Sequence, residues 1–105
     1  MDQLFEDRVS DVMVTVSGTV DRILSDDTFG SRHQRFLVRV RSGRTVLVLH
    51  NIDLAQRVPI EIGDRLTLRG EYEWNEKGGA IHWTHHDPRN QRAGGWIEHR
   101  GVRYQ

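Results

Sequence analysis

The chain has 105 residues, and its 15 Lys and Arg balance 15 Asp and Glu, so its formal net charge is zero. That length favours a single domain, and no apolar run approaches the roughly 18 residues that a membrane-spanning helix requires. The absence of cysteine excludes disulfides and zinc–thiolate sites. Residues 1–7 have neither the basic flank nor the apolar stretch of a signal peptide, so we expect a cytoplasmic protein without membrane contact.

The neutral total conceals segments of alternating charge. Residues 1–27 carry seven acidic and two basic side chains, whereas residues 28–57 carry six basic and one acidic. Residues 58–76 are acidic again, with a net charge of −3, and residues 77–105 have a net charge of +3. Neutrality therefore excludes a uniformly basic surface for a polyanion but not a local basic patch. Fourteen of the fifteen basic residues are arginine, whose planar fork suits phosphate, although GC-rich coding also produces an arginine excess.

The first predicted strand is long and bent. A short acidic helical turn precedes it, and from Val12 apolar and polar residues alternate. Gly18 interrupts this pattern, and the apolar phase slips by one residue between Val20 and Ile23. A slip of one residue indicates a β-bulge, which bends a strand so that it can serve two sheets.

Four more strands follow in chain order. The third, Thr45–Leu49, is a continuous apolar run typical of a strand that is covered on both faces. Little helix is expected between Asn51 and Pro59, and a hairpin loop is expected at Asn75–Gly79. The predicted inward residues of the other strands are Phe36, Val38 and Val40, then Leu66, Leu68, Gly70 and Tyr72, and finally Ile81 and Trp83.

This order of elements predicts the fold class. A long bent strand, a hairpin, a connection with little helix and a second hairpin are typical of the five-stranded OB-type barrel, whose closure removes exposed edges. We therefore predict an all-β fold in which residues 1–105 form one small OB-like β-barrel domain. Residues 1–11 would form an N-terminal helical turn, and residues 89–105 a C-terminal loop and β-hairpin extension. An open β-sandwich or an SH3-like barrel is the alternative.

Five segments of the sequence carry a family resemblance. They resemble the signature of a small, functionally uncharacterised bacterial family with an OB-like expected fold, and the resemblance covers about residues 18–105. It implies one fold and no activity, because none is established for the family. Many relatives look exported, whereas we expect this chain to have no leader. The segments are HNIDLA (His50–Ala55), GEYEWN (Gly70–Asn75), HWTHHDP (His82–Pro88), GSRHQRF (Gly30–Phe36) and GWIEH (Gly95–His99).

The outer face of the second strand is the candidate ligand surface. Arginines project from it, and aromatic residues occupy the two loops that flank this face in OB barrels. A basic face follows a phosphate backbone, and aromatic rings stack on bases. We therefore predict a non-enzymatic binding module for single-stranded nucleic acid or another phosphate-bearing polyanion, with no required cofactor. The alternative is a solvated face paired with the glutamates of the fourth strand. The candidate residues are Arg32, Arg35, Arg39, Arg41, Phe29 and Trp74.

Histidine and aspartate residues form a candidate metal site. If the fifth strand continues past Thr84, His82 and His86 share a face, and His50 leaves the third strand near Asp53. Imidazole and carboxylate groups bind zinc, manganese or another divalent ion, which polarises a phosphoryl group and acidifies bound water. The alternative function is thus a metal-dependent phosphodiesterase or nuclease. The spacing of these histidines and this aspartate matches no established metal motif. The competing interpretation is that the histidines only pack and form hydrogen bonds.

A second resemblance bears on that alternative. Asp26-Asp27-Thr28, a basic hairpin and then Leu49–Asp53 loosely resemble the layout of staphylococcal-type nucleases, which are also OB barrels. In that layout acidic residues after the first and third strands hold a cation, and arginine steadies the phosphate. No glutamate closely follows Asp53, so the general base is missing unless a histidine such as His50 replaces it. We therefore expect binding rather than catalysis, and we assign neither catalytic residues nor an oligomeric state.

Overall fold

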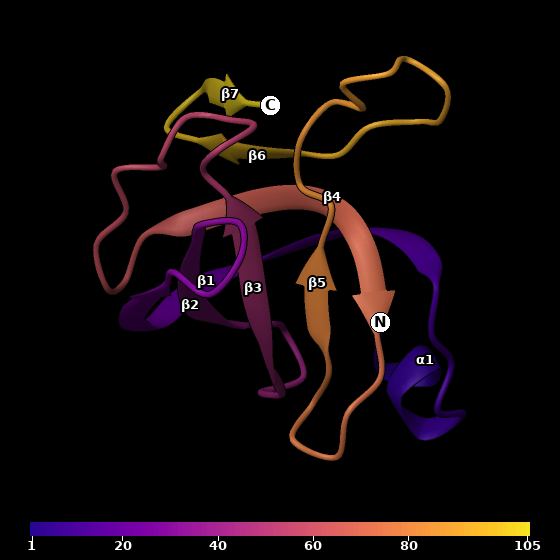
Figure 1. The fold of residues 1–105 in the computed structure, drawn as a ribbon. Coiled ribbons are helices and arrows are strands. Elements are labelled where there is room, and N and C mark those ends of the chain that lie inside the picture. The colour runs from indigo at the N-terminus through magenta and orange to yellow at the C-terminus, as the bar shows by residue number, and fades with distance from the viewer.

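The computed structural model describes residues 1–105, and its elements are seven strands and one short helix (Figure 1). The predicted all-β class is confirmed, because the helix has only five residues. No helix is long and apolar enough to cross a membrane. The elements are α1 (Asp2–Glu6), β1 (Val12–Asp27), β2 (His33–Arg39), β3 (Thr45–Asn51), β4 (Arg65–Glu73), β5 (Ala80–His82), β6 (Trp96–His99) and β7 (Val102–Tyr104).

Five of the strands pair in a closed ring. β1 pairs with β2, β2 with β3, β3 with β5, β5 with β4, and β4 again with β1. The pairing of β3 with β5 is parallel, and the other four are antiparallel. In Figure 1, β4 arches past β3 and β5, and β6 and β7 continue the sheet beyond β4. Closure gives every strand of the ring two neighbours within the ring, and β4 also pairs with β6, so β7 alone lies at a free end of the sheet.

Strand β1 belongs to two pairings because it bends. Its first half pairs with β4 from Val12 to Thr19, and its second half pairs with β2 from Thr19 onward. The register with β2 shifts between Val20 and Arg22, at the place where the sequence predicts a bulge. Gly18 lies just before this shift, and a Cβ atom there would lie 2.5 Å from the carbonyl oxygen of Arg39. Only glycine lets β1 approach β2 so closely.

The hydrophobic core fills the inside of the ring. Its residues alternate along the strands, as the period of two predicts, and Phe36, Leu68 and Tyr72 are fully buried. Trp83 departs from the predicted pattern. β5 ends at His82, and Trp83 has a φ of 59°, which turns the chain out of the strand. The buried cluster consists of Val20, Phe36, Val38, Val46, Val48, Val58, Leu66, Leu68, Tyr72, Ile81 and Ile97.

The ends of the ring are covered by segments outside it. At one end, Met1 and Leu4 of the α1 region pack against the core. At the other end, the irregular segment before β4 inserts Val58, which is fully buried. The buried Gln34 amide holds that segment, because it donates to the Val58 carbonyl at 2.7 Å and accepts from the Val58 N–H at 3.0 Å. These contacts satisfy a buried backbone segment that forms no ladder.

We expect Gly18→Ala to lower the free energy of unfolding by about 1–3 kcal/mol, because the added methyl group overlaps backbone and Val38 side-chain atoms. Urea unfolding measures this change. Ser17→Ala is the control, since it alters the neighbouring exposed position and should cost less than about 1 kcal/mol. Equal stability of Gly18→Ala and the wild type would contradict the close approach of β1 to β2.

Candidate functional site

Two of the predicted arginines are used to hold neighbouring segments. Arg32 pairs with Asp53 at 3.1 Å, and its backbone N–H donates to the same carboxylate at 2.9 Å. These contacts keep the pKa of Asp53 below its usual range. Arg35 donates from Nε to the carbonyl oxygen of Ser25 at 2.7 Å. Both side chains therefore fasten β2 to the segments beside it.

Arg39 and Arg41 line a cleft together with Arg65 of β4. The cleft has a volume of about 500 Å³. Thr19 explains the convergence, because it is the register partner of Arg39 in β2 and of Arg65 in β4. The two arginines thus lie on either side of β1 at the point where it passes from one partner to the other. The lining residues are Ser17, Gly18, Thr19, Arg39, Val40, Arg41 and Arg65.

The cleft carries excess positive charge. Arg39 is balanced by Asp21, whose Oδ1 accepts from Nε and Nη2 at 3.1 and 3.0 Å. Neither Arg41 nor Arg65 takes part in an ion pair, and no carboxylate lines the cleft. Unpaired guanidinium groups beside hydroxyl groups are a suitable environment for phosphate or carboxylate oxygens. Arg65 was not among the residues that sequence reasoning selected, because its position depends on the pairing of β4 with β1.

The predicted aromatic platforms lie away from this cleft. Phe29 is 95% exposed in the loop that precedes β2, whereas the cleft is at the other end of β2. Trp74 follows the end of β4 that is opposite Arg65. The centroid of the Trp74 ring lies 6.3 Å from that of the Phe5 ring in α1, so Trp74 packs against the helix. The structure therefore does not bring the six predicted residues together as one surface.

His50 is a buried core residue with both ring nitrogens occupied. Its side chain is fully buried, and Nδ1 lies 2.7 Å from the hydroxyl of Thr84. Nε2 lies 2.8 Å from the carbonyl oxygen of Gln56. Since a carbonyl only accepts, Nε2 carries the proton and Nδ1 accepts from Thr84. Burial lowers the pKa of His50 to about 4, so the ring is neutral and has no free lone pair for a metal.

The other predicted metal ligands are dispersed. Asp53 is exposed and paired with Arg32. His86 is exposed, with Nδ1 3.1 Å from a main-chain oxygen of Gln105. It cannot share a strand face with His82, because β5 ends at His82. The structure thus does not bring His50, Asp53, His82 and His86 together.

The carboxylates of the nuclease-like layout have local partners. Asp26 forms an ion pair with Arg57, and the Oδ1 atom of Asp27 accepts from the backbone N–H of Phe29 at 3.0 Å. The second contact is an Asx turn, a common role for aspartate in loops. These contacts leave neither side chain directed at a shared ion.

One metal-ligating group does converge. Donor atoms of Glu71, Glu73 and His82 all lie within 4.8 Å of one another. Asp11 is beside them, and its contact with the Glu73 carboxyl raises the pKa of Asp11 through hydrogen bonding and then charge repulsion. Sequence reasoning included His82 but treated the two glutamates only as partners of arginine. Their spacing of two residues predicts that both glutamates lie on one face of β4. The sequence does not predict that His82 lies beside them, because that depends on the register between β4 and β5.

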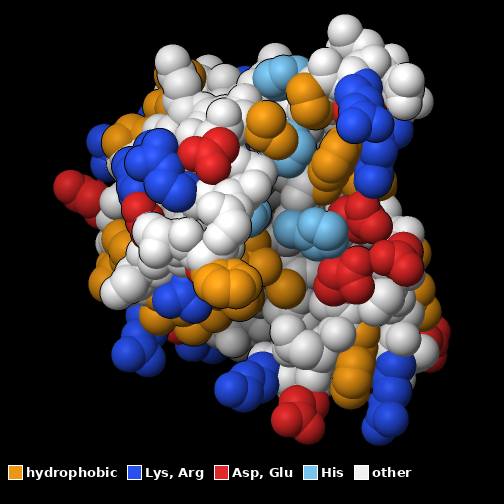
Figure 2. All heavy atoms as spheres, in the orientation of Figure 1, with side chains coloured by type: hydrophobic (Ala, Val, Ile, Leu, Met, Phe, Trp, Pro, Cys, Tyr) orange, Lys and Arg blue, Asp and Glu red, His pale blue; other side chains and the backbone are white.

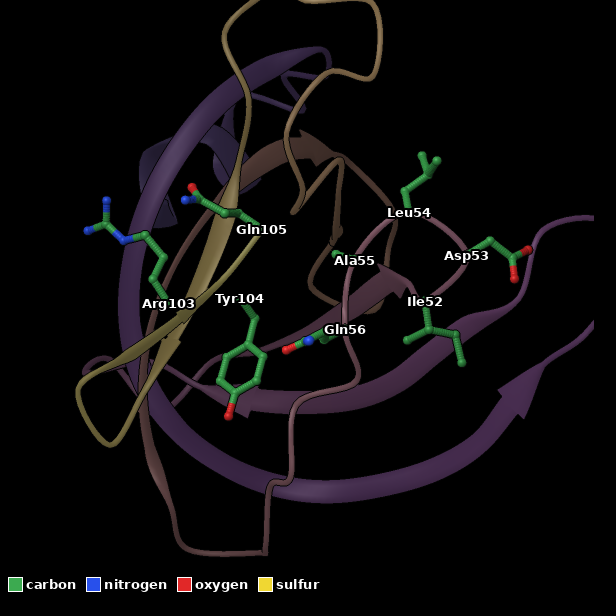
Figure 3. Close-up of a pocket in the computed structure, with 8 residues that line it drawn as sticks. All are labelled: Ile52, Asp53, Leu54, Ala55, Gln56, Arg103, Tyr104 and Gln105. Atoms are coloured by element: carbon green, nitrogen blue, oxygen red, sulfur yellow. The ribbon is translucent and has the colours of Figure 1, made fainter.

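A second hollow of about 490 Å³ lies between residues 52–56 and β7 (Figure 3). In Figure 3, Asp53 points away from the hollow and Arg103 points outward from β7. The Arg103 guanidinium lies over the Trp96 ring, 4.0 Å from its centroid. Neither charged side chain of the lining therefore points into this hollow, which makes it a weaker candidate for a charged ligand than the basic cleft.

These features define a small all-β protein with a closed ring of five strand pairings and a basic cleft on its outer surface. The chain belongs to the DUF3465 family, described as a protein of unknown function, which matches residues 1–105. Comparison with curated proteins finds no match. Membership agrees with the predicted resemblance to an uncharacterised family and assigns no activity.

The burial of His50 predicts a pH dependence of stability. As the pH falls below the ordinary histidine pKa of 6.5, the unfolded chain binds a proton that the folded chain does not bind until about pH 4. Stability from this residue is therefore complete above pH 6.5 and is lost as the pH falls towards 4, by about 3 kcal/mol in total. Burial lowers the pKa of His85 as well, so it acts in the same direction.

Titration of the histidine ring signals by NMR measures the pKa of His50 directly. Urea unfolding between pH 7 and 4.5, compared in the wild type and His50→Gln, isolates its share of the slope from that of the carboxylates. The stability difference between the two proteins should shrink as the pH falls. A His50 pKa near 6.5 would be incompatible with the neutral, doubly hydrogen-bonded ring.

Proposed function

We propose that this protein is a non-enzymatic OB-type binding module whose ligand is a phosphate-bearing polyanion, with single-stranded nucleic acid as the favoured class. The basic cleft carries this proposal. Three arginines from two parts of the chain, the end of β2 and the start of β4, line it, and two of them have no ion-pair partner. Sequence reasoning selected Arg39 and Arg41 for this role, and the cleft adds Arg65.

The ring of pairings supports the OB-type barrel. The order β1-β2-β3-β5-β4-β1, with β3 parallel to β5 and a bent β1, is the arrangement expected for that barrel. OB barrels use the outer face of strands two and three and the flanking loops for extended ligands. The basic cleft adjoins this face at the end of β2 through Arg39 and Arg41, and its other lining residues belong to β1 and β4. A strand bound along the face would place two neighbouring phosphates at the cleft, one beside each unpaired arginine.

The arrangement of the arginines suits phosphate binding energetically. Asp21 and the carbonyl oxygen of Gly43, which accepts from Nη1 at 2.7 Å, hold the Arg39 side chain in place. Little side-chain entropy of Arg39 is then lost on binding. Arg41 and Arg65 supply the uncompensated charge, and each phosphate contact releases counterions. Two such contacts to a single strand give a slope of about −1.4 in a plot of log affinity against log salt.

We expect the double variant Arg41→Ala/Arg65→Ala to bind labelled single-stranded oligonucleotides at least about tenfold more weakly, because both unpaired phosphate partners are lost. The salt slope should fall by about 1.4. Fluorescence anisotropy with DNA and RNA oligonucleotides at several salt concentrations measures both quantities.

The matched control is Lys77→Ala/Arg89→Ala, which removes two exposed positive charges that form no ion pair and lie outside the cleft, and it should weaken binding only slightly. Equal losses in the two double variants would mean that total charge, not the cleft, governs binding. Absence of wild-type binding at low salt would reject the proposal. The same samples, run on gels with and without chelator, report strand cleavage, and cleavage that the chelator abolishes would favour the phosphodiesterase alternative.

A further inference from the structure

The converging group at the other end of β4 has a geometry that follows from strand pairing. Glu71 and Glu73 flank the buried Tyr72, so both project from the outer face of β4. His82 of β5 is the register partner of Glu71 and lies on the same face, with Nε2 3.3 Å from the Oε1 atom of Glu73. Asp11 is fixed next to them, because its backbone N–H donates to the Tyr72 carbonyl at 2.9 Å.

The spacing of the donor atoms suits a first-row divalent ion. Metal–ligand bonds of about 2.0–2.2 Å place two ligand atoms at most about 4.4 Å apart. The donors of Glu71, Glu73 and His82 lie within 4.8 Å of one another, so small side-chain adjustments are sufficient. Both β4 and β5 are hydrogen-bonded on two sides, which keeps the backbone of all three residues in place. One imidazole among carboxylates favours zinc or manganese over magnesium or calcium.

The charges around the group also favour a cation. Three carboxylates, those of Asp11, Glu71 and Glu73, face a single full positive charge, which belongs to Arg92. The Nη2 atom of Arg92 donates to Oε2 of Glu71 at 2.8 Å, and its guanidinium is stacked 4.3 Å from the Trp83 ring centroid. Arg92 thus orients Glu71 and leaves its other oxygen free, as outer partners of metal ligands do. Figure 2 shows acidic side chains gathered beside a histidine on this face, with basic side chains above them.

We propose that Glu71, Glu73 and His82, with Asp11 beside them, bind one zinc or manganese ion. Sequence reasoning expected a metal from a different set of residues, and only His82 belongs to both sets. The site is separate from the basic cleft, because Glu71 lies six positions after Arg65 on β4, which corresponds to about 20 Å along a strand. It does not depend on polyanion binding.

Metal titration of the full chain tests the site. Protein freed of metal with a chelator and dialysed is titrated with zinc or manganese by calorimetry, and loss of the free-manganese EPR signal gives an independent stoichiometry. We expect one ion per chain and a higher thermal midpoint at saturating metal. Glu73→Gln and His82→Gln should each weaken binding at least about tenfold and reduce that thermal shift, because each removes a ligand.

The controls repeat the same chemical changes outside the group. Glu98→Gln and His86→Gln should bind zinc and manganese as the wild type does. Wild-type affinity in His82→Gln, or a loss confined to His86→Gln, would overturn the site. Thermal midpoints without metal show whether the variants are folded, and ring nitrogen shifts of His82 on zinc addition report coordination directly. Arg41→Ala/Arg65→Ala should retain metal binding, so failure of the two proposals is distinguishable.

Discussion

Closure of the strand ring depends on the bend in β1. One half of β1 pairs with β4 and the other with β2, and Thr19 has partners in both. The absence of a side chain at Gly18 and the register shift after Val20 make this change of partner possible. Arg39, Arg41 and Arg65 lie around this bend. The first half of β1 begins directly after Asp11, whose backbone N–H donates to Tyr72 near the far end of β4. The bend therefore positions the basic cleft, whereas the pairing of β4 with β5 positions the acidic group and the first half of β1 places only Asp11 beside it.

Positive and negative side chains are separated along the outer face of β4, although the net charge of the protein is zero. This face begins with Arg65, continues through Arg69, and ends with Glu71 and Glu73. Arg69 is held at mid-strand by a 3.0 Å hydrogen bond from Nη1 to the hydroxyl of Thr15 in β1. Because positive and negative groups occupy opposite ends of one strand, a neutral protein can present local surfaces of either sign. Net charge therefore says little here about which ligands the protein can bind.

The alternation of apolar and polar residues within single strands made much of the fold predictable. Features that depend on which strands pair with each other could not be predicted in this way. The period of two located the buried faces around Phe36 and Leu68, and the phase slip located the bulge in β1. Those signals lie within single strands. The cleft and the acidic group instead depend on which strands pair and in what register, so Arg65 was missed. Trp83 was misplaced because its left-handed backbone, with φ of 59°, is uncommon for a bulky residue and left no signal in the alternation.

The separation of the two ends of β4 determines how their ligands would influence each other. A distance of about 20 Å exceeds the Debye length of about 8 Å at physiological ionic strength, so a cation at Glu73 scarcely alters the potential at Arg65. At about 0.01 M salt the Debye length is about 30 Å, and the same cation would strengthen anion binding in the cleft. Coupling by charge must therefore disappear as salt is raised. Coupling that persisted at physiological salt would have to pass through movement of β4, which its pairings with β1, β5 and β6 resist.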